Sequence, residues 1–432
     1  MGRGLTPLGT RNPNRTLALL LCAAVGLFIP GCWDGIELQQ RAIVLMIGID
    51  PGFSASPSSM NGESESAPGE TALTTEKQDE TPKAPDVMVT LQLANPQALA
   101  GDRSGGSGDG NGAKRVVTVS EQGENVMDAL YKIQLSLNRR LFYNNLQAVV
   151  ISRHVANRGV ADIMNPLIQA RVVSRNLWVF ISDRPAVEFL RQSPKLDVIP
   201  AMYLTNLFRN KVWLNRPYDA TIGGFHQRLS TPGVEPFALD IAGVEHNLSA
   251  PRIKGIVTFS GDRLAGEMSG REFVGWALVQ NQLPHTVFVY RCPNGPNDGF
   301  VVNIKSARCR VRVRTADGGS APPVIDLQVR LRGSVEGGVC AVNQDAERLK
   351  TLQMAVESQS AEMITSAIHR AQTEKTDVFG FGRELYRHQP RAWRGDAWWA
   401  NAFPSAQVRV TVGARLDFVQ TYTRTEFVYQ QG

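Results

Sequence analysis

The sequence predicts a mixed fold in which β-strands and α-helices share each folded unit, of the α/β or α+β class. Short apolar runs and segments of alternating polarity recur along the chain, with apolar residues at helical spacing between them. The 432 residues are enough for two or three domains. Apolar residues make up 43% and charged residues 20%, which excludes a multi-span membrane protein and a wholly disordered chain.

The charge balance is mildly basic and identifies no partner by itself. The chain has 46 Lys and Arg against 40 Asp and Glu, without the basic blocks typical of nucleic-acid binding. We therefore predict no nucleic-acid partner. Acidic residues concentrate between residues 51 and 86, so the rest of the chain is more basic than the total. This excess indicates either a basic face toward anionic lipid or an ordinary solvated surface.

The first 31 residues have the pattern of an export signal. Arg3, Arg11 and Arg15 precede an apolar run of about 15 residues, shorter than the ~20 that a spanning helix needs. A small residue, Gly31, directly precedes Cys32, as in bacterial lipoprotein signals, although Pro30 departs from that pattern. We predict that residues 1–31 are removed and that Cys32 carries the lipid anchor. The alternatives are an ordinary cleaved signal and an uncleaved anchor.

The cysteines agree with export without establishing it. Beyond Cys22 in the signal and Cys32, the chain has Cys292, Cys309 and Cys340 and no Cys-x-x-Cys pair. A zinc or thioredoxin-like site is therefore not expected. The three cysteines allow either one disulfide or buried free thiols.

Residues 32–200 are predicted to form an N-terminal domain. The apolar run at 41–50 is typical of a buried strand, and residues 51–85, rich in Ser, Gly, Glu, Thr and Pro, of a disordered insertion. A second Gly-rich loop is expected at 101–112. Further strands are expected at 86–93, 114–120, 146–152 and 176–182, and helices at 124–137 and around 164–170.

The remainder divides into a middle region and a C-terminal domain. Residues 201–252 have weak periodicity and are predicted to be a small or connecting domain, and residues 253–425 a strand-rich one. Its strands are expected at 253–259, 299–314, 324–336 and 406–418. A helix at 343–373 is predicted because one face collects Leu349, Leu352, Val356, Met363, Ala367 and Ala371, and a second helix carries Leu385 and Tyr386.

No arrangement typical of an enzyme occurs in the sequence. Phosphate-binding loops, the His-Glu-x-x-His zinc motif and the Gly-x-Ser-x-Gly nucleophile turn are absent, and the six histidines are scattered. We therefore expect no catalytic residue, no metal site and no cofactor.

Two other clusters each allow a functional and a structural interpretation. The aromatic cluster of Trp393, Trp398, Trp399 and Phe403 suits a stacking platform for a ligand, but is more typical of a core or subunit interface. The pair Arg139–Arg140 suits an anion or a lipid headgroup, while capping of the preceding helix is the simpler explanation.

Four blocks of the chain resemble the Ger(x)C family, the lipoprotein C subunits of spore germinant receptors. The first begins at the lipidation site, Gly31-Cys-Trp-Asp, and ends on the Gly-Ile-Asp of residues 48–50. The others follow in order: Leu137–Tyr143 with Gln147–Ser152, Gly255–Gly266, and Asp377–Tyr386 followed by Trp393, Trp398 and Phe403.

The resemblance implies an α+β fold of three mixed-sheet domains with flanking helices in an elongated arrangement. It also implies a non-enzymatic role beside the A and B membrane subunits of a receptor in the inner spore membrane. Only Cys32 transfers from the family as a functional residue, because it bears the lipid. The nutrient that such a receptor senses is not implied.

Two rival functions are less consistent with the sequence. A substrate-binding lipoprotein of a membrane transporter requires two matched lobes around a cleft, which the strand-rich C-terminal part does not suggest. An exported cell-wall hydrolase requires a paired-carboxylate or metal site, for which no motif is found.

Overall fold

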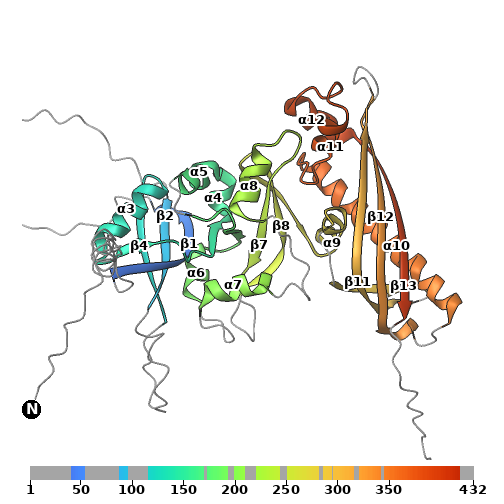
Figure 1. Cartoon of the computed structure of the whole chain (residues 1–432), viewed down its shortest axis with the longest axis horizontal. Coiled ribbons are helices and arrows are strands. Elements are labelled where there is room, and N and C mark those ends of the chain that lie inside the picture. Colours follow the sequence, from blue (N-terminus) through green and yellow to red (C-terminus); the bar gives the residue numbers. More distant parts are fainter. Residues whose placement is uncertain are drawn as a thin grey trace, which may run out of the picture. The chain divides into compact units, whose positions relative to one another are not determined.

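The computed structural model describes residues 40–53, 87–95, 115–169, 173–192, 199–209, 220–243, 251–281, 286–293, 295–315, 321–341 and 345–418. The predicted signal at 1–31, the lipidation site Cys32 and the Gly-rich loop at 101–112 lie outside these residues, as does nearly all of the predicted insertion at 51–85. The described residues form an α+β fold with two mixed sheets, which confirms the predicted fold class (Figure 1).

The first sheet has nine strands, and its central strands are parallel. The order is β3-β2-β1-β5-β6-β7-β8-β9, with β4 paired to β1. Strands β1, β5, β6 and β7 run parallel, whereas β2, β3, β8 and β9 pair antiparallel with their neighbours. The strands are β1 (Arg41–Pro51), β2 (Val87–Ala94), β3 (Val116–Gly123), β4 (Arg140–Phe142), β5 (Ala148–Ser152), β6 (Trp178–Ser182), β7 (Phe237–Ala242), β8 (Arg252–Ser260) and β9 (Arg263–Ser269).

Alternate residues of the central strands enter two different cores. In β5, Val149 and Ile151 belong to one apolar cluster, while Ala148 and Val150 belong to the other. Helices cover both faces of these strands, and every residue of β5 is buried, as is usual for parallel strands. The first cluster contains residues of α3 (Val126–Ser136), α4 (Arg153–Arg158), α5 (Ala161–Gln169) and α8 (Ile222–Leu229). The second contains residues of α6 (Ala186–Arg191) and α7 (Pro200–Arg209). Figure 1 shows the two groups of helices on opposite faces of the sheet.

The second sheet has four strands and packs on one long helix. Its order is β10-β11-β12-β13, and only β12 and β13 are parallel. The strands are β10 (Thr286–Cys292), β11 (Gly295–Arg314), β12 (Val324–Gly338) and β13 (Gln407–Phe418). The long helix is α10 (Ala346–Thr373), accompanied by α9 (Gly270–Val279), α11 (Phe381–His388), α12 (Asp396–Ala402) and the short 3₁₀ helices η3 (Val339–Ala341) and η4 (Phe403–Ser405).

The strands and helices predicted from periodicity occur in the structure with ends shifted by a few residues. The predicted helix at 343–373 is α10, and five of the six apolar residues that indicated it are buried. Leu349 is partly buried against the same core. Leu385 is buried in α11, while Tyr386 beside it is 44% exposed.

The division into domains stays a prediction, but the first sheet crosses two of its boundaries, at 200/201 and at 252/253. Strand β7 from the predicted middle region lies between β6 and β8 in the first sheet. The boundary at 252/253 falls after the first residue of β8, a strand that is paired with β7 along its length. All six residues of β7 are buried, so its sequence lacks the alternation that would have indicated a strand.

A disulfide resolves the alternatives left open for the cysteines. Cys292 at the end of β10 is bonded to Cys340 in η3, with 6.0 Å between their Cα atoms. Cys309 in β11 is a free, partly buried thiol. Among the residues described, no helix combines the length and the apolar character that crossing a membrane requires.

Candidate functional site

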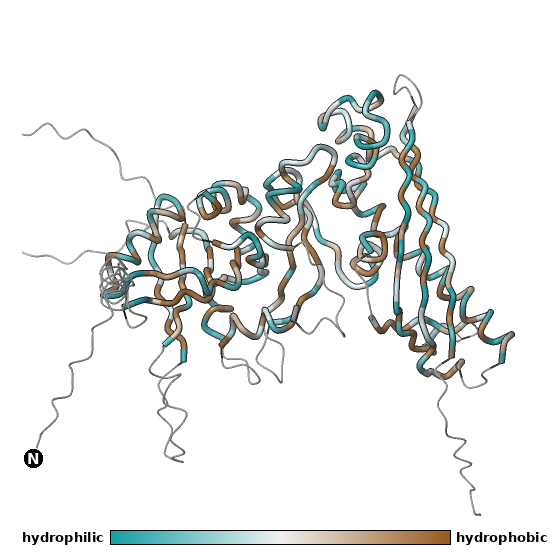
Figure 2. The backbone as a smooth tube through the Cα atoms, in the orientation of Figure 1, coloured by the Kyte–Doolittle hydropathy of each residue, from teal (hydrophilic) through white to brown (hydrophobic). Residues whose placement is uncertain are grey.

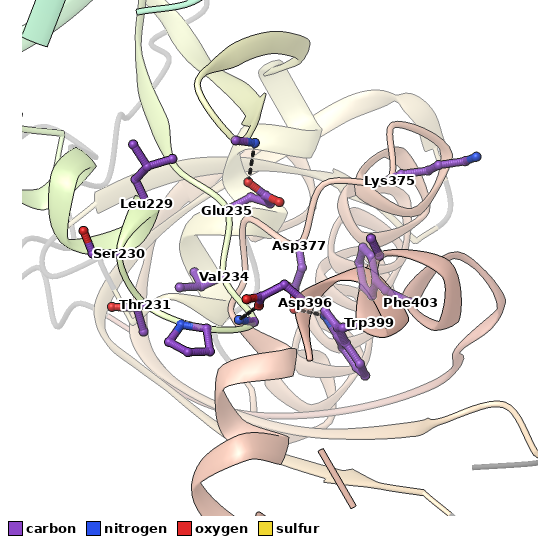
Figure 3. Close-up of a pocket in the computed structure, with 14 residues that line it drawn as sticks. Leu229, Ser230, Thr231, Val234, Glu235, Lys375, Asp377, Asp396, Trp399 and Phe403 are labelled. Atoms are coloured by element: carbon purple, nitrogen blue, oxygen red, sulfur yellow. Dashed lines mark hydrogen bonds between the residues drawn. The ribbon is translucent and has the colours of Figure 1, made fainter. Parts of the chain in front are cut away.

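A cavity of about 260 Å³ lies where two segments distant in sequence meet (Figure 3). One segment, residues 229–235, connects α8 to β7, and the other follows α10 and continues through α11 and α12 to η4. Its polar walls include three carboxylates, from Glu235, Asp377 and Asp396, and its aromatic wall is Trp399 with Phe403. This region is therefore the candidate functional site.

Asp377 is the most completely bonded of these carboxylates. It is 3% exposed, and its Oδ1 accepts hydrogen bonds from the backbone N–H groups of Gly380 (2.8 Å) and Phe381 (3.1 Å). Its Oδ2 accepts from the Gly382 N–H (2.7 Å) and from Trp399 Nε1 (2.8 Å). The aspartate thus caps the first turn of α11 and fastens α12 to it.

Opposing effects act on the Asp377 carboxyl. Burial raises its pKa above the usual value, while the three backbone N–H groups and the Trp399 indole oppose that rise. All four partners are donors, so the side chain serves as an acceptor on both oxygens. Its geometry is that of a structural cap.

Gly233 brings the second segment against this capped loop. Its backbone has φ of +69°, and a Cβ at this position would lie 2.4 Å from the carbonyl carbon of Gly382. The Gly233 N–H donates to Asp396 Oδ1 (2.7 Å), and its carbonyl accepts from the Arg383 N–H (2.8 Å). Glycine is required here because the two backbones touch and the conformation is left-handed.

Arg228 and Glu235 complete the contact on either side of Gly233. The buried Arg228 guanidinium donates to the Val378 carbonyl (3.0 Å) and lies over the Phe237 ring. The Glu235 N–H donates to the Asp377 carbonyl (3.0 Å). We call the contact of residues 228–235 with residues 377–383 and Asp396 the junction.

The Glu235 side chain accepts a hydrogen bond from the Gly261 N–H (2.8 Å), in the turn between β8 and β9. Burial raises the pKa of this carboxyl, and the negative charges of Asp377 and Asp396 raise it further. Among the described residues, no group of three or more His, Cys, Asp or Glu is placed to hold a metal ion. The three carboxylates accept hydrogen bonds from backbone N–H groups and, in Asp377, also from the Trp399 indole.

The aromatic cluster expected to be core or a stacking platform is mostly core. Trp399 is 3% and Phe403 1% exposed, with ring centroids 5.9 Å apart. Trp393 and Trp398 are partly buried and pack against the same apolar cluster. The rings therefore support the junction from the side of α12.

The predicted residues are only partly brought together. The block Asp377–Tyr386 and the cluster of Trp399 and Phe403 meet at the junction, while Arg139 and the exposed Arg140 lie at the start of β4, in the first sheet. Residues 228–235 and Asp396 were not identified from the sequence. The only local signal was the turn sequence Thr231-Pro-Gly-Val, which indicates a loop and not its contact partner.

The molecule is thus an α+β protein of two mixed sheets, fastened through a buried, hydrogen-bonded junction. Comparison with protein families adds its relationship to known proteins. The model of the spore germination protein N-terminal domain matches residues 34–241, and the model described as spore germination B3/GerAC like, C-terminal, matches residues 254–417. The chain belongs to the Ger(x)C family of spore germination proteins, which confirms the resemblance seen in the sequence.

Curated relatives come from Bacillus subtilis (strain 168). Spore germination protein KC is 24% identical over 91% of this chain and 93% of its own length. Putative spore germination protein YfkR is 22% identical over 84% of this chain and 85% of its own. A crystal structure of the GerBC protein covers 78% of this chain and 95% of that chain, at 13% identity and a TM-score of 0.47.

Proposed function

We propose that this chain is the non-enzymatic C subunit of a spore germinant receptor, acting with A and B membrane subunits in nutrient-triggered germination. The observation that carries the proposal is the match of two spore germination domain models, in order, to residues 34–241 and 254–417. The junction is consistent with a non-enzymatic role, because its three carboxylates accept hydrogen bonds from N–H groups of the chain itself.

We also propose that a lipid on Cys32 holds the protein at the extracytoplasmic face of the inner spore membrane. Its support is the basic segment, the short apolar run and Gly31 before the cysteine. The disulfide between Cys292 and Cys340 is consistent with export, because such bonds persist outside the reducing cytosol.

The receptor role is tested by dipicolinate release from purified dormant spores. A strain lacking this protein is compared with its parent across nutrients, with dodecylamine as a receptor-independent trigger, in a background without redundant receptors. Loss of the response to at least one nutrient, with the dodecylamine response intact, is the expected result. Unchanged nutrient responses would contradict the receptor role and favour a transporter lipoprotein.

The anchor is tested by labelling cells with a radioactive fatty acid. The chain with Cys32→Ala should lose the label and leave the membrane fraction, because the thiol that would carry the lipid is gone. Cys22→Ala is the matched control, since it removes a cysteine from the signal and should keep the label. Label retained in Cys32→Ala would contradict the proposed anchor.

A further inference from the structure

The outward face of the second sheet carries a concentration of arginines. Along β11, every second residue from Arg308 to Arg314 is an arginine, because the strand period places these positions on one face. The eight arginines that β11, β12 and β13 place on this face are exposed: Arg308, Arg310, Arg312, Arg314, Arg330, Arg332, Arg409 and Arg415. We call it the arginine face.

Strand register places some of these like charges directly opposite each other. Arg308 pairs with Arg330 across β11 and β12, and Arg332 pairs with Arg415 across β12 and β13. Directly opposed like charges destabilise a sheet. The arrangement therefore costs stability unless an anionic surface lies against it.

Few carboxylates compensate this charge. Asp326 and Asp417 lie on the same side of the sheet by register, and Asp326 forms an ion pair with Arg314. That pair is the only one that the described residues provide for the eight arginines. The face thus keeps a clear excess of positive charge.

The opposite side of the sheet is occupied by the protein core. In β12, Ile325, Leu327 and Val329 alternate with the outward residues and are buried in the cluster that includes α10. Figure 2 shows this alternation of apolar and polar residues along the long strands. The arginines are therefore on the side of the sheet that α10 does not occupy.

We propose that the arginine face binds the surface of a bilayer containing anionic phospholipids. Charge complementarity supports this occupant, and guanidinium groups bond phosphate oxygens well. The single-sign charge spreads over three adjacent strands, which suits a surface whose charged headgroups can gather laterally. The proposal rests on the lipid-anchored location proposed above, which holds the chain at a membrane.

Arginine footprinting on the full chain tests the proposal. The chain is treated with p-hydroxyphenylglyoxal in the presence of vesicles of phosphatidylcholine alone or mixed with phosphatidylglycerol, and each arginine is quantified by mass spectrometry. Anionic vesicles should protect the arginine face, while exposed Arg175, Arg191 and Arg391 react equally in both. Equal reactivity of the arginine face in the two vesicles would overturn the proposal.

A charge variant gives an independent readout by vesicle co-sedimentation. Arg308→Gln, Arg310→Gln, Arg330→Gln and Arg332→Gln are combined. The control combines four exposed basic residues outside this face, as Arg175→Gln, Arg191→Gln, Lys350→Gln and Arg391→Gln. Each basic residue near an anionic membrane contributes about fivefold in binding, so the first variant, which lacks four of them, should lose roughly 600-fold and the control much less. Equal binding of both variants to anionic vesicles would overturn the proposal.

Other occupants are distinguished in the same footprinting experiment. Soluble polyglutamate that protects the arginine face as well as anionic vesicles do would assign it to an acidic polypeptide and overturn the lipid proposal. A chain that carries the Cys32 lipid and supports germination, but whose arginines stay unprotected, would keep the proposed function and lose this inference. Protection by anionic vesicles, together with unchanged germination of the strain that lacks the protein, would keep this inference and contradict the proposed receptor role.

Discussion

The Asp377 side chain accepts more hydrogen bonds than the other carboxylates of the junction. A substitution at Asp377 therefore tests how much this cap contributes to stability. In Asp377→Asn the amide would place a donor against the donors of Gly382 or Trp399. We expect a loss of about 2–4 kcal/mol in the free energy of unfolding, because buried donors lose their acceptor. Urea unfolding measures it, with Asp417→Asn on an exposed strand position as the control. Equal stabilities of the two variants would contradict the cap assigned to Asp377.

Glu235 gives a pH-dependent prediction of known sign. Its pKa is raised by burial and by Asp377 and Asp396, so the folded chain holds this proton more tightly than the unfolded chain. This contribution to stability is complete below the unfolded pKa and is lost as the pH rises through the folded pKa. Glu235→Gln removes the charge and keeps an acceptor for the Gly261 N–H. We therefore expect it to raise the melting temperature at pH 7 and to give little advantage near pH 4, as measured by thermal unfolding at both pH values.

At the scale of elements, two loops approach closely at Gly233. A substitution there tests the cost of a steric clash, which can be compared with the cost of backbone strain alone. Gly233→Ala would set a Cβ against the Gly382 backbone in a left-handed conformation, so we expect a loss of about 2–4 kcal/mol. Gly261→Ala is the matched control, since Gly261 also has a positive φ but nothing within 4 Å of the added carbon. It should lose about 1 kcal/mol, from strain alone. Urea unfolding of both variants tests the difference, and equal losses would mean that the approach is not tight.

The disulfide ties β10 to η3 across 48 residues of sequence. Replacing Cys292 and Cys340 together with serine should reduce the unfolding free energy by about 2–5 kcal/mol, because the unfolded chain gains freedom. Cys309→Ala is the control for the free thiol. Dithiothreitol should lower the melting temperature of the parent chain and leave that of the double variant unchanged. A parent chain insensitive to the reductant would contradict this bond as a source of stability.

Elements with a clear period, and strands formed by a continuous apolar run such as that at 41–50, were predictable from sequence. Strands β11, β12 and β13 alternate because one face meets α10 and the other meets solvent. Strand β7 was not predicted, because burial on both faces removes the alternation and Asp240 interrupts its short apolar run. The disulfide partner of Cys292 could not be deduced, since pairing depends on how β10 and η3 come together in space.

The candidate site was predictable only on one side. The block Asp377–Tyr386 was identified by resemblance, and Trp399 by its aromatic neighbours. The segment around Gly233 was not, because its partner lies about 150 residues away and a turn sequence carries no information on long-range contacts. Sequence patterns report local structure, while the junction is a tertiary contact.

At the scale of the whole molecule, the continuous first sheet and the shared core predict cooperative unfolding. Strand β7 is paired with β8, and the larger apolar cluster includes residues of both sheets, such as Leu239 and Leu327. We expect far-ultraviolet circular dichroism and tryptophan fluorescence to report coincident urea transitions. Two separated transitions would contradict this coupling.

The pairing of β7 with β8 also constrains how such genes can recombine. A crossover between residues 241 and 254 would join the first half of one relative to the second half of another, at the boundary between the two family models. The hybrid would have to pair a β7 and a β8 that had accumulated mutations separately. That pairing would also have to reproduce the register shift between Asp240 and Ile241. Exchange after β9 would leave that pairing intact, so inheritance should keep β7, β8 and β9 together as one block.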